Sequence, residues 1–171
     1  EVGVLKVGDA GTLVGQSILT AGEPVADVLF GIDTTFLCRG TRAGLFTPYA
    51  PVALADVDDA LEQDPDHLVT PIDVGDVCLN YSRSAFPDPD DAPRGLDDLA
   101  DERFAEQFVT QNPESSSPGL AFLLATIAEY GPDGWQDYWE RLRDNGLEVT
   151  SGWEEAYNEA FGAGSGVLGG G

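Results

Sequence analysis

Basic residues are scarce in this 171-residue chain, which has 8 Lys plus Arg against 31 Asp plus Glu. Lys6 is the single lysine, and the formal net charge is -23. A surface of this sign repels polyanions, which excludes nucleic acids and anionic membrane surfaces as partners. The hydrophobic content of 42% excludes a disordered acidic protein, and the length is enough for one sizeable core or two small lobes.

The near-absence of lysine, with Asp outnumbering Glu, favours adaptation to high salt, where screening weakens the self-repulsion of a charged fold. Two other interpretations stay open, an ordinary solvated surface and a cation-binding surface. The acidic run at 88–91 lacks the glycine and the terminal glutamate of an EF-hand loop, so no metal site is expected there.

Cysteine and histidine are nearly absent as well. Cys38 falls in a predicted helix and Cys78 in an apolar predicted strand, so both are expected to be buried free thiols, with one disulfide left open for an exported protein. The single histidine, His67, is expected to be solvated in an acidic loop. No Gly-x-Ser-x-Gly elbow, signal peptide or membrane span is found, and no enzymatic activity or cofactor is expected.

Apolar and turn patterns predict alternating strands and helices, which is the order of an α/β protein with a parallel sheet. Strands are expected at 5–7, 25–32, 68–72, 77–81, 108–110 and 147–150. Helices are expected at 10–21, 35–43, 96–105, 118–130, 133–144 and 152–161, the first capped by Asp9 and the second by Thr34 or Thr35. The glycine-rich stretch at 162–171 is not expected to pack.

The segment 112–119, Asn-Pro-Glu-Ser-Ser-Ser-Pro-Gly, is the most informative one, because it joins a predicted strand to a long apolar helix. The first N–H groups of a helix lack intrahelical partners and carry the positive end of the helix dipole. Serine hydroxyls there cap the helix or donate to an incoming oxyanion. Open α/β sheets bind ligands beyond the carboxyl ends of their strands, and Asp9-Ala10, Ser115–Ser117 and Trp153 all follow predicted strands.

Three motifs follow in order: Ser117-Pro118-Gly119-Leu120, Gly134-Trp135, and the heptapeptide Ser-Gly-Trp-Glu-Glu-Ala-Tyr at 151–157. With 26–33 and 70–76 upstream, this order resembles the substrate-binding proteins of thiamine ABC transporters, over about 5–157. The resemblance implies a two-lobed α/β fold of the type II periplasmic-binding-protein class, incomplete at both ends. It implies part of lobe 1 in 1–74, a crossover and acidic surface loop in 75–103, and part of lobe 2 in 104–171.

The resemblance also implies a ligand site. Asp9 and Ala10 align with a contact pair of the first lobe, and Ser116 and Ser117 align with a hydroxyl pair that holds the hydroxyethyl or phosphate end of the ligand. Trp153 is expected to face the thiazolium cation. The weaker ligand-binding candidates are Asp33, Asp73, Ser115 and Tyr157. The family often has tyrosine where Val74 and Asp76 stand, and also after Leu168, where this chain has glycine.

The function implied is that of an extracytoplasmic solute-binding protein that captures thiamine or its phosphate esters between two lobes. Its partner is then the membrane permease of an ABC importer, and a lipid anchor in a full-length parent stays open. Two alternatives remain: a binding protein for another cation, such as a polyamine or ferric ion, and an acidic surface interaction protein with no small ligand. The clustered tyrosines and hard ligands that ferric iron needs are missing from the cleft positions.

Overall fold

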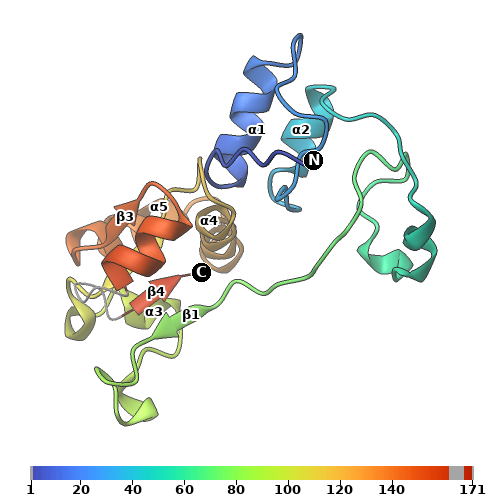
Figure 1. The fold of residues 1–171 in the computed structure, drawn as a ribbon. Coiled ribbons are helices and arrows are strands. Elements are labelled where there is room, and N and C mark those ends of the chain that lie inside the picture. The colour runs from blue at the N-terminus through green and yellow to red at the C-terminus, as the bar shows by residue number, and fades with distance from the viewer. Residues whose placement is uncertain (1, 162–167, 171) are drawn as a thin grey trace. The chain divides into compact units, whose positions relative to one another are not determined.

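The computed structural model describes residues 2–161 and 168–170, and it divides into two compact units, Glu1–Asp76 and Val77–Gly171 (Figure 1). Each unit has buried residues of its own. We call them unit 1 and unit 2 and describe each by itself.

Unit 1 consists of two helices and long irregular segments. The helices are α1 (Ala10–Leu19) and α2 (Leu37–Arg42), followed by the short 3-10 helices η1 (Val52–Asp56) and η2 (Asp59–Leu61). Val14 of α1 is fully buried, and α1 and α2 pack together. The turn before α2 is held by Asp33, whose carboxylate accepts hydrogen bonds from the Thr35 hydroxyl at 2.8 Å and the Phe36 N–H at 3.4 Å. The predicted threonine cap is therefore wrong.

No strand occurs among the described residues 2–76, so the strands predicted at 5–7, 25–32 and 68–72 are wrong. One apolar side chain in each of these segments stands in solvent, since Leu5, Val28 and Ile72 are exposed by 63%, 82% and 68%. An apolar run becomes a strand only where a neighbouring strand exchanges backbone hydrogen bonds with it, and the described part of unit 1 supplies no such neighbour.

Unit 2 is built on a four-stranded sheet. Its strands are β1 (Leu79–Tyr81), β2 (Phe108–Gln111), β3 (Glu148–Thr150) and β4 (Leu168–Gly170), in the spatial order β1-β4-β2-β3. The middle strand β2 runs parallel to both β3 and β4, whereas β1 pairs antiparallel with β4. The parallel arrangement predicted from the sequence is thus found here, with β2 and β3 close to their predicted positions.

The glycine-rich end of the chain was expected not to pack, and for 168–170 this is wrong, because β4 lies between β1 and β2. Backbone hydrogen bonds in a sheet need no side chain, and the glycine leaves room for a ring: a Cβ on Gly169 would stand 3.2 Å from a ring carbon of Phe161. The rest of that prediction, at 162–167 and 171, lies outside the described residues.

Helices cover both faces of the sheet. The longer ones are α4 (Ser117–Tyr130) and α5 (Trp135–Asp144), which match their predictions to within two residues. The helix predicted at 96–105 is split into α3 (Leu96–Leu99) and η4 (Glu102–Phe104), because the Asp101 carboxylate accepts the Arg103 N–H and starts a new turn. The 3-10 helix η3 (Pro89–Asp91) lies in the acidic loop, and the π-helix η5 (Glu155–Phe161) follows β3.

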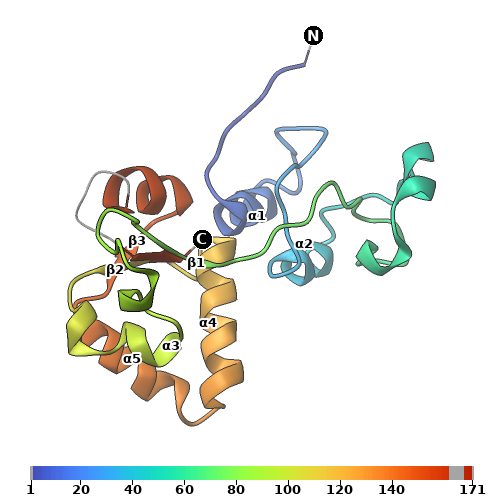
Figure 2. The same ribbon diagram turned by 90° about the horizontal axis from the view of Figure 1, so that it is seen from below.

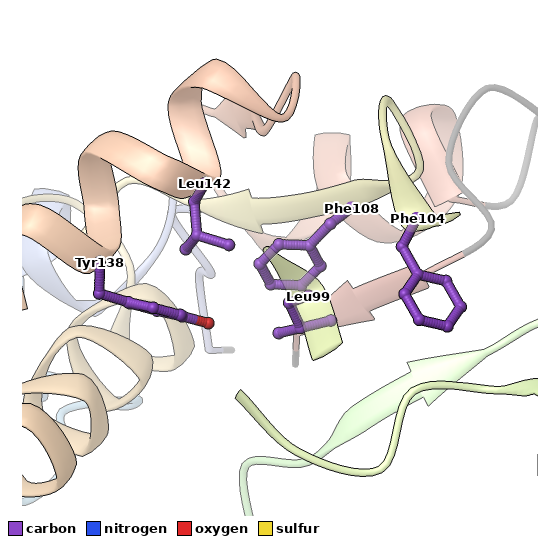
Figure 3. Close-up of a cluster of buried hydrophobic side chains, with 5 residues drawn as sticks. All are labelled: Leu99, Phe104, Phe108, Tyr138 and Leu142. Atoms are coloured by element: carbon purple, nitrogen blue, oxygen red, sulfur yellow. The ribbon is translucent and has the colours of Figure 1, made fainter. Parts of the chain in front are cut away.

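Side chains of β2 alternate between two hydrophobic clusters. Phe108 packs on the face covered by α3 and α5, in a cluster with Leu99, Phe104, Tyr138 and Leu142 in which no member is more than 4% exposed (Figure 3). Val109 points to the other face, where it packs under η5. Figure 2 shows the sheet between the red C-terminal helix and the layer of α3 and α5. Burial of each large apolar side chain contributes about 1.5–3 kcal/mol.

Both cysteines are free and exposed, so the prediction of buried thiols is wrong. Cys38 does lie in α2, but on its outward side, and Cys78 precedes β1 instead of lying within it. His67 agrees better with its prediction: its side chain is 41% exposed, and Nδ1 lies 3.6 Å from Glu62 Oε2.

Candidate functional site

The carboxyl ends of β2, β3 and β4 meet at one edge of unit 2, because these strands run parallel. Gln111 ends β2 and leads through a short loop to α4, whereas Thr150 ends β3 and leads to the next helix. The chain enters unit 2 at this edge too, since Leu79 of β1 pairs with Gly170. Such an edge is where α/β sheets place their ligands.

The serine turn, Ser115–Ser117, is shaped by the backbone and side chain of Asn112. The Asn112 carbonyl accepts the Ser116 N–H at 3.0 Å, and its Oδ1 accepts the Glu114 N–H at 2.9 Å. Ser116 is the N-cap residue of α4 and Ser117 the first residue of the helix. Gly119 lets the helix start against the end of β2, because a Cβ there would overlap the Gln111 carbonyl oxygen.

Although Ser116 occupies the N-cap position of α4, its side chain does not cap the helix. Its side chain is fully buried, makes no capping hydrogen bond, and its Oγ has no hydrogen-bond partner. Within the described residues, the other buried side-chain atoms without a partner are Thr110 Oγ1 and Gln111 Oε1. Buried polar groups are nearly always paired, and each unmade hydrogen bond costs about 1–3 kcal/mol. Their concentration at one strand end therefore marks this edge as a candidate site.

The serine turn is tied to the loop after β3. The Ser115 hydroxyl donates to the Ser151 carbonyl oxygen at 2.6 Å. Ser151 in turn donates from its hydroxyl and its N–H to Glu155 Oε2, at 2.6 and 2.8 Å. These two hydrogen bonds, the hydroxyl one first, lower the pKa of Glu155 below its ordinary value. A charged Glu155 thus fixes the start of the helix that carries Trp153.

Trp153 and Tyr157 form a stacked pair of rings, which we call the aromatic pair. Their centroids are 5.0 Å apart, their planes differ by 8°, and the two residues are 42% and 44% exposed. Phe161 continues the row, at 5.6 Å from the Tyr157 ring. Tyr157 and Phe161 belong to the π-helix η5, and Trp153 precedes it. π-helical turns are rare in proteins, but where they occur they often lie at functional sites. The pair presents a broad aromatic surface beside the serine turn.

A shallow pocket lies on the η5 face of the sheet, with space for little more than a water molecule. Its lining includes Asn80, Val109, Gln111, Tyr157, Phe161 and Gly169. Tyr157 therefore belongs both to the aromatic pair and to the pocket. Gln111 and Asn80 were not among the site residues predicted from the sequence. A signal for Gln111 was available, because strand alternation places this polar residue on the buried face of Val109, at a strand end.

The other predicted site residues belong to unit 1. Asp9 is the N-cap residue of α1, but its carbonyl, not its side chain, bonds the helix, accepting the Leu13 N–H at 2.9 Å. Ala10 begins α1 and is buried, Asp33 holds the turn before α2, and Asp73 is exposed in an irregular segment. The structure thus brings Ser115, Ser116, Ser117, Trp153 and Tyr157 to one edge of unit 2, and places the other four on separate parts of unit 1.

A sheet whose strand ends carry a serine turn and a partly exposed aromatic pair is typical of ligand-binding α/β proteins. Residues 23–167 match the family model of the bacterial extracellular solute-binding proteins, and the chain belongs to this family. The location outside the cytoplasm that the resemblance implied is thereby confirmed. In the part of the chain that the structure describes, no helix has the length and apolar character to cross a bilayer.

The chain is also similar to the thiamine-binding periplasmic protein of Brucella abortus, with 29% identity over 161 residues, 92% of this chain and 45% of that protein. It is similar to the solved structure of a periplasmic thiamin binding protein, at 25% identity and a TM-score of 0.74, covering 95% of this chain and 49% of that one. A periplasmic binding protein, AfuA from Actinobacillus pleuropneumoniae, is similar in fold, with 23% identity, a TM-score of 0.77, and coverage of 96% and 53%.

These likenesses establish the type II periplasmic-binding-protein fold. The chain spans about half the length of the curated relatives and solved structures that it matches.

Proposed function

We propose that this chain is part of a solute-binding protein that captures thiamine or a thiamine phosphate ester and delivers it to the permease of an ABC importer. The observation that carries the proposal is the exposed aromatic pair, joined to the serine turn by the hydrogen bond from Ser115 to Ser151. The name of the Brucella relative, together with the sequence resemblance, supports the choice of ligand.

Thiamine has a permanently cationic thiazolium ring, a flat aminopyrimidine and a hydroxyethyl arm. The aromatic pair suits the cation, because the faces of Trp and Tyr rings attract positive charge. Such a contact contributes roughly 0.5–2 kcal/mol, depending on how far it is desolvated. The net charge of -23 acts at longer range, since an acidic protein draws a cation toward its surface.

The serine turn suits the other end of the ligand. Ser116 and Ser117 stand at the start of α4, where unpaired backbone N–H groups and the helix dipole favour an anion. A hydroxyl or phosphate oxygen placed there receives hydrogen bonds from the serine turn, and bonds to a charged phosphate are the stronger ones. In unit 1, Asp9 and Ala10 stay proposed ligand residues on the resemblance alone, and Asp33 and Asp73 stay weaker ones.

Calorimetric titration with thiamine tests the proposal. We expect Trp153→Ala to weaken binding at least about tenfold, a loss of roughly 1.4 kcal/mol. Trp135→Ala is the matched control, because Trp135 lies at the start of α5, outside the candidate site. An unchanged dissociation constant in Trp153→Ala removes the aromatic pair from the site, and the absence of thiamine binding by the whole protein that contains this chain contradicts the proposed function itself.

A further inference from the structure

Gln111 has a buried side-chain amide whose oxygen lacks a hydrogen-bond partner. The residue is 2% exposed, its Oε1 has no hydrogen-bond partner, and it lines the pocket under η5. A buried carbonyl oxygen without a donor destabilises a fold, because it loses its hydrogen bonds to water and gains none in return. An unpaired acceptor at the sheet edge where α/β proteins bind their ligands is explained if a bound ligand supplies the donor.

The pocket around Gln111 restricts what that donor is. Of the described residues that line it, Val109, Phe161 and Gly169 are apolar, Asn80 and Tyr157 are polar, and none is charged. Because there is space for little more than a water molecule, one small donor group enters while the rest of a ligand stays outside. Gly169 keeps this space open, since a Cβ there would stand 3.2 Å from the Phe161 ring. The pocket therefore suits a single neutral N–H or O–H group.

Tyr157 connects this pocket to the aromatic pair. Its ring stacks on Trp153 and it also lines the pocket beside Gln111. A flat ring bound against these aromatic residues would therefore be adjacent to the pocket, where a small substituent on its rim could meet the unpaired oxygen. A held water is the alternative occupant, because Asn80, Gln111 and Tyr157 place polar residues around this space. The melting temperature of a Gln111 variant without ligand distinguishes the two.

We propose that Gln111 is a specificity-determining residue whose Oε1 accepts a hydrogen bond from a neutral amino group on the flat ring of the ligand. For thiamine this group is the exocyclic amine of the pyrimidine, and to that extent the inference rests on the proposed function. Gln111 thereby selects rings that carry a donor at that position over rings of the same shape without one. A site built to receive a hydrogen bond discriminates in this way, because the unmatched analogue leaves its acceptor unpaired.

The test is a double-mutant cycle between Gln111 and the amine. The chain and Gln111→Met, which keeps the side-chain length and removes the acceptor, are titrated with thiamine and with its des-amino analogue. We expect Gln111→Met to weaken thiamine binding about tenfold more than binding of the analogue. Gln136→Met on α5 is the control, and it should treat both ligands as the unmodified chain does.

A second measurement separates recognition from a structural role. Without ligand, Gln111→Met should melt at the same temperature as the unmodified chain or higher, because it removes a buried unpaired acceptor. A lower melting temperature indicates an internal partner, such as a held water, and overturns the inference. Equal losses for thiamine and its analogue overturn it as well, while the proposed function stands. If the whole protein that contains this chain binds neither ligand, the proposed function fails and this inference fails with it.

Discussion

The two units differ in what their apolar segments do. In unit 2, Phe108 and Val109 of β2 are buried by at least 96% between helices on both faces. In unit 1, Val28 and Phe30 lie in an almost equally apolar run, yet they are 82% and 71% exposed. The difference is the presence of neighbours, since β2 lies between β3 and β4 while the described part of unit 1 has no strand at all.

This contrast shows that an apolar run in the sequence indicates residues that would be stabilised by burial, but does not show whether other segments are present to bury them. A strand is stabilised by hydrogen bonds and packing that come from segments far away in the sequence. The reverse case is β4, whose two glycines bring almost no apolar surface but occupy the middle of the sheet.

The largest effect is expected for matched phenylalanine truncations. Phe108→Ala should destabilise unit 2 by about 3–5 kcal/mol, because it removes a ring from the cluster around Leu99 and Tyr138. Phe30→Ala should change the stability of unit 1 by no more than about 0.5 kcal/mol, because its ring is in solvent. Amide hydrogen exchange in β2 and in α1 measures the two effects separately. Equal losses in both units would erase the distinction between them.

A pair of glycine substitutions probes close packing. Gly119→Ala should destabilise unit 2 by about 1–3 kcal/mol, because the new methyl group overlaps the Gln111 carbonyl oxygen. Gly15→Ala in α1 should be neutral or stabilise by up to about 1 kcal/mol, since its Cβ meets only a guanidinium nitrogen of Arg39 at 4.0 Å. Urea titration followed by circular dichroism checks both. A harmless Gly119→Ala would show that α4 does not lie against β2 as described.

The serine turn gives a difference between ligands. Ser116→Ala combined with Ser117→Ala should weaken binding of thiamine phosphate about tenfold more than binding of thiamine, because charge-assisted hydrogen bonds are the stronger ones. Ser17→Ala in unit 1, whose hydroxyl bonds the Leu13 carbonyl, is the control. If both ligands lose the same affinity, the serines only shape the start of α4.

Salt should stabilise the chain if its acidic surface is an adaptation to high ionic strength. The melting temperature is then expected to keep rising from about 0.1 M to several molar KCl, although the Debye length has already fallen to about 3 Å at 1 M. Differential scanning calorimetry over this range gives the answer. Full stability at low salt would leave the -23 charge as an ordinary solvated surface.

The smallest expected effect is the pH dependence of stability that Glu155 contributes. Because its hydrogen bonds to Ser151 lower the pKa of Glu155 from 4.5, this carboxylate stabilises the folded state above about pH 4.5. The contribution is lost as the pH falls through the lowered value of the folded state. Glu155→Gln should therefore melt below the unmodified chain at pH 7, and the gap should close in acid. A gap that is constant with pH would mean that charge is not involved; Glu140→Gln on α5 serves as control.

In unit 2, α4, α5, β2 and β3 were predictable from the sequence because their signals are local. The apolar run 120–128 predicted α4, and Pro118 with Gly131 marks its two ends. The strands of unit 1 and β4 were not predictable, since pairing depends on distant residues. Exposure of Cys38 was missed for a related reason: a helix predicts which residues share a face, but not which face is covered.

The residues of the candidate site also divide into those that local sequence patterns predict and those that depend on distant contacts. Ser115–Ser117 and Trp153 were found from the sequence because they follow strands and belong to motifs. Gln111 was not predicted: strand alternation places it on the buried face of Val109, but its unpaired oxygen is seen only in the packed structure. The link from Ser115 to Ser151 joins residues 36 positions apart, and no local pattern encodes it.

The central claim is that one edge of unit 2 binds the ligand, and mapping by NMR tests it most directly. Thiamine is titrated into the isotopically labelled chain, and backbone and side-chain shifts are followed to saturation. We expect saturable shifts to concentrate at Ser115–Ser117, Trp153, Tyr157 and the Gln111 amide, while those of α5 stay unchanged. Shifts that never saturate, or that gather on α5 and spare the aromatic pair, would contradict it.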